Sequence, residues 1–407
     1  MTPKWLAAAL AAATPWGGAG CEQRAQEIQT EAQLRQTVGQ MMPAVERATG
    51  LTFKHHPLVL RRGRAQVRDY VIHKFAEELP PAELQGATAA YRLFGLIPDS
   101  LDLRRTMIDL LTEQIAGYYD PDSDALFIRS DIEPFQFRVV VSHELVHALQ
   151  HQYLNLDSLI QQERQNDRRA AAQAILEGQA VLSQIPVLMP EQRPETLPAG
   201  WFWRQREVAA QQQAQMPEFA HAPLWLRETL IFPYLGGAEF VRWFRRQYPG
   251  QQPYGALMPT STEQILDPSR YVARDRPREV AFEVPAPDAV IYEDDLGAFE
   301  IRLLFTELLG SEERAAVYAA GWDGDRYQVL SAGSDALVWY TVWEDQPAAV
   351  RFAKGLELAW AKRRPAGRAV RRSDIALLTI DGRPAVRLVD APLNWAGWRT
   401  LPRVRVK

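Results

Sequence analysis

The sequence predicts an α+β protein, in which a mainly helical domain with a small sheet is followed by a smaller α+β module. Three observations lead to this fold class. An apolar segment at residues 139–151 carries polar residues at helical spacing, and several other segments repeat apolar residues every three or four positions. The C-terminal part instead combines short β-rich runs with helix patterns. A chain of 407 residues is long enough for two or three domains.

The start of the chain indicates export. Lys4 precedes the apolar run Trp5–Ala13, and small residues at 17–20 complete the pattern of a secretory signal peptide. Cys21 is the only cysteine, so it has no intramolecular disulfide partner, and its position resembles the lipidated first residue of a bacterial lipoprotein. Gly18 departs from the usual apolar residue of that motif, and an incidental cysteine is the alternative. We therefore expect an exported protein held in the cell envelope, in the periplasm or at the outer membrane, by an N-terminal lipid anchor.

Composition and spacing divide the rest of the chain. The formal net charge of −4 gives no sign of a nucleic-acid partner. The predicted organisation is a signal peptide at 1–20, a tether and α/β lead-in at 21–100, a catalytic domain with a helical lower lobe at 101–273, a linker at 274–290 and a C-terminal α+β module at 291–407.

The lead-in and the first part of the central domain are predicted element by element. Apolar spacing predicts helices, and β-rich runs between turn residues predict strands. The expected elements are a helix at 22–48, a strand at 51–60, helices at 66–79, 82–96 and 100–117, a turn at 118–124, a strand at 125–129, and a helix capped by Asp131 with Pro134 in its first turn.

This last helix contains the motif HExxH. His143 and His147 are four residues apart, so on a helix they share one face, about 6 Å apart along the axis, and can converge on one metal ion. Glu144 stands beside them, where a carboxylate can take a proton from metal-bound water and pass it to a leaving amine. The expected ion is a single Zn²⁺, because neutral imidazoles with a carboxylate suit it.

A catalytic zinc needs a third protein ligand. The metzincin pattern requires glycine and histidine where this chain has Gln150 and Tyr153, and His151 lies about 12 Å from His143 along the helix axis, which is too far. Glu177 is the better candidate, because it is the one acid in the apolar helix pattern of residues 170–182. Gly178 beside it allows that helix to approach its neighbour closely. The alternative is a solvated glutamate on a helix face.

Five segments together resemble a family of bacterial and archaeal gluzincin-type predicted metallopeptidases, many of them lipoproteins. The segments are GYYDP at 117–121, HELVHALQ at 143–150, LEGQA at 176–180, STEQILDP at 261–268 and GWDGDRY at 321–327, and the resemblance covers residues 101–357. It implies a zincin-like fold, with zinc on His143, His147 and Glu177 and with Glu144 as the base. In such enzymes a strand before the helix borders the cleft, and residues 125–129 are expected there.

One position departs from the family pattern. Many gluzincins carry an aspartate four residues after the ligand glutamate, where it orients a histidine, and this chain has Val181. A partner from elsewhere, Asp120 or Asp157, or none at all, is expected instead.

The second half offers fewer site residues. Helices are expected at 201–216 and 238–248, and a hairpin through Asp381–Gly382 is expected between strands 375–380 and 385–389. A donor opposite the metal could stabilise a transition-state oxyanion. The candidates, for each of which core packing is the alternative role, are Tyr119, Tyr234, Tyr271 and His221.

These observations predict a zinc-dependent endopeptidase of the cell envelope that acts on peptide or protein substrates. A catalytically silent zinc-containing scaffold or binding protein is the first alternative, and a metal-dependent hydrolase of cell-wall amides is the second.

Overall fold

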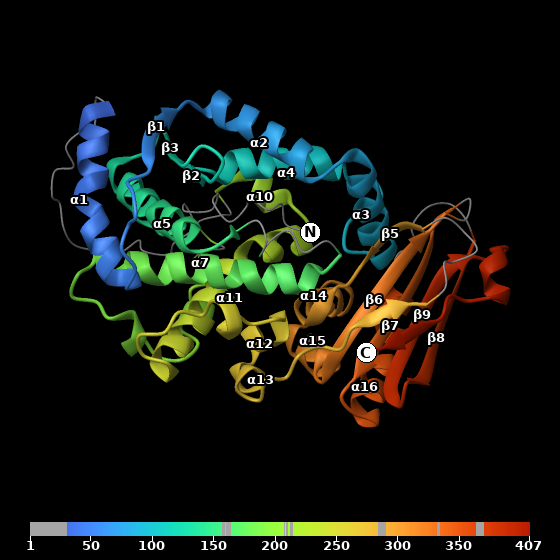
Figure 1. Ribbon diagram of the computed structural model, residues 1–407. Coiled ribbons are helices and arrows are strands. Elements are labelled where there is room, and N and C mark those ends of the chain that lie inside the picture. The colour runs from blue at the N-terminus through green and yellow to red at the C-terminus, as the bar shows by residue number, and fades with distance from the viewer. Residues whose placement is uncertain are drawn as a thin grey trace.

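The computed structural model describes residues 31–407, except 157–158, 160–163, 207, 209–210, 212–214, 284–289, 332–333 and 364–369. The protein is α+β, as expected, with a helical N-terminal part and a sheet-containing C-terminal module (Figure 1). Cys21 and the predicted signal peptide lie outside the described residues. Among the helices that the structure describes, none combines the length and the apolar content needed to span a bilayer.

Helices make up most of the N-terminal part. They are α1 (Glu31–Thr49), α2 (Arg64–Glu78), α3 (Pro81–Phe94), α4 (Leu103–Gln114), α5 (Pro134–Tyr153), α7 (Asn166–Leu188), α8 (Trp201–Arg204), α10 (Pro217–His221), α11 (Leu224–Gln247), α12 (Thr262–Leu266) and α13 (Pro268–Val272). Within this part α5, α7 and α11 lie across the centre of the molecule, and α1 packs at the end away from the C-terminal sheet (Figure 1).

A three-stranded sheet covers α5. Its order is β1 (Leu58–Arg62), β3 (Ala125–Arg129) and β2 (Gly117–Asp120), with β1 parallel and β2 antiparallel to β3. The prediction of a turn at 118–124 is therefore wrong in its first half, because Tyr118–Asp120 belong to strand β2. Strand 125–129 is present as expected, but it is the central strand.

The C-terminal module contains a five-stranded antiparallel sheet and helices on one of its faces. Its strands are β5 (Val290–Asp294), β6 (Trp322–Leu330), β7 (Ala336–Trp343), β9 (Arg383–Pro392) and β8 (Arg371–Ile380), in that order across the sheet. Its helices are α14 (Gly297–Leu309), α15 (Glu312–Ala319) and α16 (Gln346–Lys362). The predicted hairpin is present, and Asp381 and Gly382 at its turn both have positive φ.

The segment expected as a linker contains a strand. β4 (Val280–Phe282) pairs with β10 (Val404–Val406), and this small sheet covers the face of the five-stranded sheet opposite the helices. The helical face shares its core with the N-terminal part, where Phe94 of α3 packs edge-on against Tyr327 and Trp339. The two parts are therefore joined by a continuous apolar core.

Two glycines allow α7 and α11 to cross in backbone contact. A Cβ atom on Gly178 would lie 2.1 Å from the carbonyl carbon of Gly237, and one on Gly237 would lie 1.8 Å from the carbonyl oxygen of Ala174. No other residue type fits without moving a helix. The close approach expected at Gly178 is thus present, and it fixes where the neighbouring Glu177 lies.

We expect Gly178→Ala to lower the free energy of unfolding by about 3 kcal/mol, because the new methyl group would collide with the backbone of α11. Urea unfolding at neutral pH measures the change. Gly39→Ala is the matched control, because a Cβ on that residue of α1 meets nothing within 4 Å. It should raise stability by roughly 0.5–1 kcal/mol. Equal effects of the two substitutions would contradict the backbone contact.

The N-terminus of α7 is bound by acidic side chains. The backbone N–H groups of Asn166 and Asp167 donate to the carboxylates of Asp294 (3.0 Å) and Asp295 (2.7 Å) at the end of β5. The side chain of Asp167 in turn accepts hydrogen bonds from the backbone N–H and the hydroxyl of Thr262. Burial raises the pKa of Asp167 to about 7.

This raised pKa predicts a pH dependence of stability. The unfolded chain loses the proton of Asp167 near its ordinary pKa of 3.8, whereas the folded protein holds the proton to about pH 7. The free energy of unfolding should therefore fall as pH rises through this interval, by an amount on the order of 4 kcal/mol from this group. Asp167→Asn stays neutral and should lack this contribution. Urea unfolding of the metal-free wild type and variant at pH 4 and pH 8 tests it, and equal pH dependence in both proteins would contradict it.

Candidate metal centre

Helix α5 carries the HExxH motif into the core. The helix begins with Pro134 after the N-cap residue Glu133. Asp131, which was expected to cap it, instead pairs with Arg129. From Val139 to Gln150 every residue of the helix is buried, including His143, Glu144 and His147. A helix buried on all sides must find partners for its polar side chains within the protein.

Glu177 on α7 meets both histidines. Its Oε2 lies 3.0 Å from Nε2 of His143 and 3.4 Å from Nε2 of His147, and the glutamate is only 1 % exposed. One ligand atom from each of the three residues falls within 4.8 Å of the others. The structure thus brings together the three residues predicted as ligands, and the alternative of a solvated Glu177 is wrong.

The chemistry of this group fits a divalent metal ion. Burial lowers the pKa of His143, which favours the neutral imidazole. Burial alone would raise the pKa of Glu177, but the attraction of His147 and the hydrogen bond with His143 lower it below its ordinary value. His147 Nε2 and Glu177 Oε1 are buried and make no hydrogen bond in the described structure. Two imidazoles and one carboxylate, with buried atoms still lacking partners, form a donor set suited to zinc.

Glu144 lies beside the ligands with one oxygen held and the other without a partner. Its Oε2 accepts a hydrogen bond of 2.9 Å from the backbone N–H of Tyr119, and its buried Oε1 has no hydrogen-bond partner among the described residues. Burial, and then the charge of Glu177, raise the pKa of Glu144 well above its ordinary value. A carboxyl group with a raised pKa near a metal-bound water is suited to accept and return a proton.

The strand next to Glu144 is β2, which forms one edge of the three-stranded sheet. The strand at 125–129, expected to border the site, lies one position further from this edge. Gly117 makes the close approach possible, because a Cβ there would lie 2.4 Å from Cγ1 of Val140 on α5. The edge of β2 therefore faces α5.

Two glutamine side chains lie next to the Nδ1 atoms of the two histidines. Nδ1 of His143 lies 3.1 Å from Oε1 of Gln184, and Nδ1 of His147 lies 2.8 Å from Oε1 of Gln150. Asp120, one expected partner, instead accepts hydrogen bonds from Tyr70 and Ser123. The other, Asp157, lies outside the described residues.

The spacing of these two glutamines in the sequence indicates that they lie near the candidate ligands. Gln150 follows His147 by three residues, and Gln184 follows Glu177 by seven, so each shares a helix face with a ligand. An amide in an otherwise apolar helix face indicates a buried polar partner.

The structure distinguishes the four candidate transition-state donors by their positions. The ring of Tyr234 on α11 stacks on the ring of His143 at a centroid distance of 5.8 Å. The hydroxyl of Tyr119 lies instead 2.7 Å from Asp124 and 2.7 Å from His151. Tyr271 donates to the carbonyl of Leu257, and His221 is exposed on the short helix α10. Tyr234 is thus the candidate that lies against a predicted ligand.

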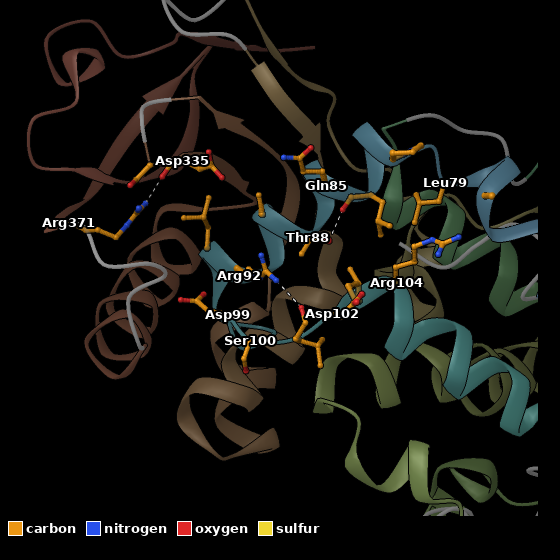
Figure 2. A pocket seen from close by; sticks show the side chains of 18 residues that line it. Leu79, Gln85, Thr88, Arg92, Asp99, Ser100, Asp102, Arg104, Asp335 and Arg371 are labelled. Carbon is orange, nitrogen blue, oxygen red and sulfur yellow. Dashed lines mark hydrogen bonds between the residues drawn. The ribbon is translucent and has the colours of Figure 1, made fainter. Parts of the chain in front are cut away.

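A cavity of about 1010 Å³ lies away from this centre, between α3, the start of α4 and the C-terminal module. Figure 2 shows Arg92 directed toward the chain near Asp102, while Arg371 and Asp335 form the opposite wall. None of its lining residues belongs to the metal centre. The cavity therefore gives no support for a substrate site at the metal.

Comparison with known proteins bears on the C-terminal module alone. A family model described as a domain of unknown function (DUF8575) matches residues 288–392, from the start of β5 to the end of β9. The metal centre lies outside this match. No curated protein and no solved structure matches the chain.

Proposed function

We propose that this protein is a zinc-dependent peptide hydrolase in which His143, His147 and Glu177 hold the ion and Glu144 is the general base. One observation carries the proposal. The two histidine Nε2 atoms and the Glu177 carboxylate converge in the core, and Glu144, the residue after His143, has an Oε1 atom that makes no hydrogen bond to a described residue. Three protein ligands leave a fourth zinc position for water, as catalytic sites require.

The roles of the residues follow from their contacts. A bound zinc ion would polarise the scissile carbonyl and lower the pKa of a bound water. Oε1 of Glu144 would accept the proton as the water oxygen bonds to the carbonyl carbon, and Glu144 would return it to the amine nitrogen as the C–N bond breaks. The N–H of Tyr119 holds the other oxygen of Glu144 in place.

A peptide is proposed as substrate because the HExxH glutamate of a metallopeptidase takes a proton from water and returns it to a leaving amine. Strand β2 positions this base. All four of its residues are buried, and the N–H of Tyr119, which points away from β3, already donates to Glu144.

Cleavage assays test the proposal. The zinc-loaded protein should cleave an unfolded protein such as casein or members of a peptide library, a chelator should stop cleavage, and added zinc should restore it. A protein that binds zinc but cleaves no peptide would contradict the proposal. In that case purified murein is the next substrate, and inactivity on murein as well would leave a zinc-containing scaffold.

The location is proposed from the sequence. We infer that Cys21 is lipidated after removal of residues 1–20 and anchors the protein in the cell envelope. Incorporation of radiolabelled palmitate that is lost in Cys21→Ala would support this anchor. Incorporation that is equal in both proteins would contradict it.

A further inference from the structure

A row of glutamine side chains extends from the metal centre to the N-terminal helix. It begins with Oε1 of Gln150, which lies 2.8 Å from Nδ1 of His147. A histidine that binds a metal through Nε2 needs its proton on Nδ1, and a carbonyl oxygen at Nδ1 favours that tautomer. Gln184 offers the same kind of oxygen to Nδ1 of His143.

The orientation of the Gln150 amide is set by its other partners. Its Nε2 donates to the backbone carbonyl of Leu176 and to Oε1 of Gln179, each at 2.9 Å. Because a backbone carbonyl can only accept a hydrogen bond, Leu176 holds the NH₂ group on its own side. The oxygen of Gln150 must then face His147, and a flipped amide would lose both hydrogen bonds.

The row continues in the same direction. Nε2 of Gln179 donates to Oε1 of Gln252 at 2.8 Å, and Nε2 of Gln252 donates to the carbonyl oxygen of Thr49 at 2.8 Å. Thr49 is the last residue of α1, which packs on α5 and α7 through its own apolar core. Each amide accepts a hydrogen bond from one neighbour and donates one to the next. Every donor in the row from α1 to His147 therefore meets an acceptor.

We infer that Gln150 and Gln184 are positioning residues that hold His147 and His143 in the metal-binding tautomer. Because Gln179 and Gln252 link Gln150 to the carbonyl of Thr49, the packing of α1 also helps to orient His147. The inference rests on the zinc site of the proposed function, but it does not require peptide cleavage. It also explains why Val181 can stand where related enzymes are expected to have an acid, because neutral amides supply the acceptors instead.

Zinc affinity of the full-length chain, measured by competition with a chromophoric chelator, tests the inference. Gln184→Leu removes the acceptor from His143 and should weaken zinc binding by about 10–100-fold. Gln184→Glu keeps an oxygen at that position and loses no hydrogen bond, because Nε2 of Gln184 has no partner in the described structure. Gln184→Glu should therefore bind zinc at least as tightly as the wild type. If Gln184 had a purely structural role, both variants would bind zinc more weakly than the wild type.

The second histidine and α1 are tested in the same way. Gln150→Leu should weaken zinc binding by about 10–100-fold, and Gln252→Leu should weaken it by a smaller factor. Gln328→Leu is the matched control, because Gln328 is equally buried but bonds to Glu293 in the C-terminal module. It should leave zinc affinity unchanged. The visible absorption spectrum of the cobalt-substituted protein should shift in Gln184→Leu and Gln150→Leu and stay unchanged in Gln328→Leu.

The outcomes separate this inference from the proposed function. If the wild type binds zinc and both leucine variants at 150 and 184 bind it equally well, the inference is overturned and the zinc site stands. Unchanged affinity in Gln252→Leu overturns the part that reaches α1. If the wild type binds no zinc, the proposed function itself fails. Should Gln150→Leu not fold, the pair of variants at Gln184 still decides the role of the amides.

Discussion

Replacing Glu144 with glutamine is expected to lower kcat for peptide cleavage by roughly 10²–10⁴-fold while zinc stays bound. The glutamine can still accept a hydrogen bond from the N–H of Tyr119. It cannot take a proton from water, so the loss should appear in the chemical step rather than in metal content. Steady-state cleavage of a fluorogenic peptide, with zinc content measured on the same samples, checks both parts.

The control for this substitution is Glu191→Gln. Glu191 is exposed and follows the end of α7, so the same change of charge there should leave kcat unaltered. If Glu144→Gln cleaved peptides at the rate of the wild type, Glu144 would not be the base. If it lost zinc together with activity, the carboxylate would have a role in binding the metal.

Replacing Glu177 with alanine is expected to weaken zinc binding by more than about 100-fold, because loss of a direct ligand should exceed the 10–100-fold effect of an outer partner. Zinc binding stabilises the folded protein, by about 2.7 kcal/mol at a free zinc concentration of 100 times Kd. Zinc at that concentration should therefore raise the Tm of the wild type and leave the Tm of Glu177→Ala nearly unchanged.

Thermal unfolding with and without zinc provides this measurement, and Glu191→Ala serves as the control. The control should respond to zinc as the wild type does, because Glu191 is exposed beyond the end of α7. A zinc-dependent rise in Tm that is the same in Glu177→Ala and in the wild type would place the metal elsewhere in the chain.

The convergence of the three candidate ligands could be predicted from local patterns, because each pattern has a physical requirement. Two histidines four residues apart share a helix face whatever the fold around them. Glu177 could be predicted because a single acid in an apolar helix is costly to bury without a partner. The hairpin at Asp381–Gly382 could be predicted because the turn needs positive φ at both residues, and both have it.

The features that sequence reasoning missed depend on distant partners. Residues 118–120 precede a Pro–Asp–Ser–Asp run typical of a turn, but pairing with β3 makes them a strand. β4 is short and pairs with residues near the C-terminus, so no local signal marks it. The glutamine row joins four segments that are separate in the chain, namely α1, α5, α7 and the residues after α11. The packing of α1 and α11 on α7 brings Gln252 between Thr49 and Gln179.

A crystal structure of the zinc-loaded protein tests the central claim most directly. It should show one zinc ion bonded to Nε2 of His143 and Nε2 of His147 at about 2.0–2.1 Å, to a carboxylate oxygen of Glu177 at about 2.0–2.2 Å, and to one water near Glu144. Zinc bound at other residues, or bound here with the Glu177 carboxylate outside the coordination sphere, would contradict the claim.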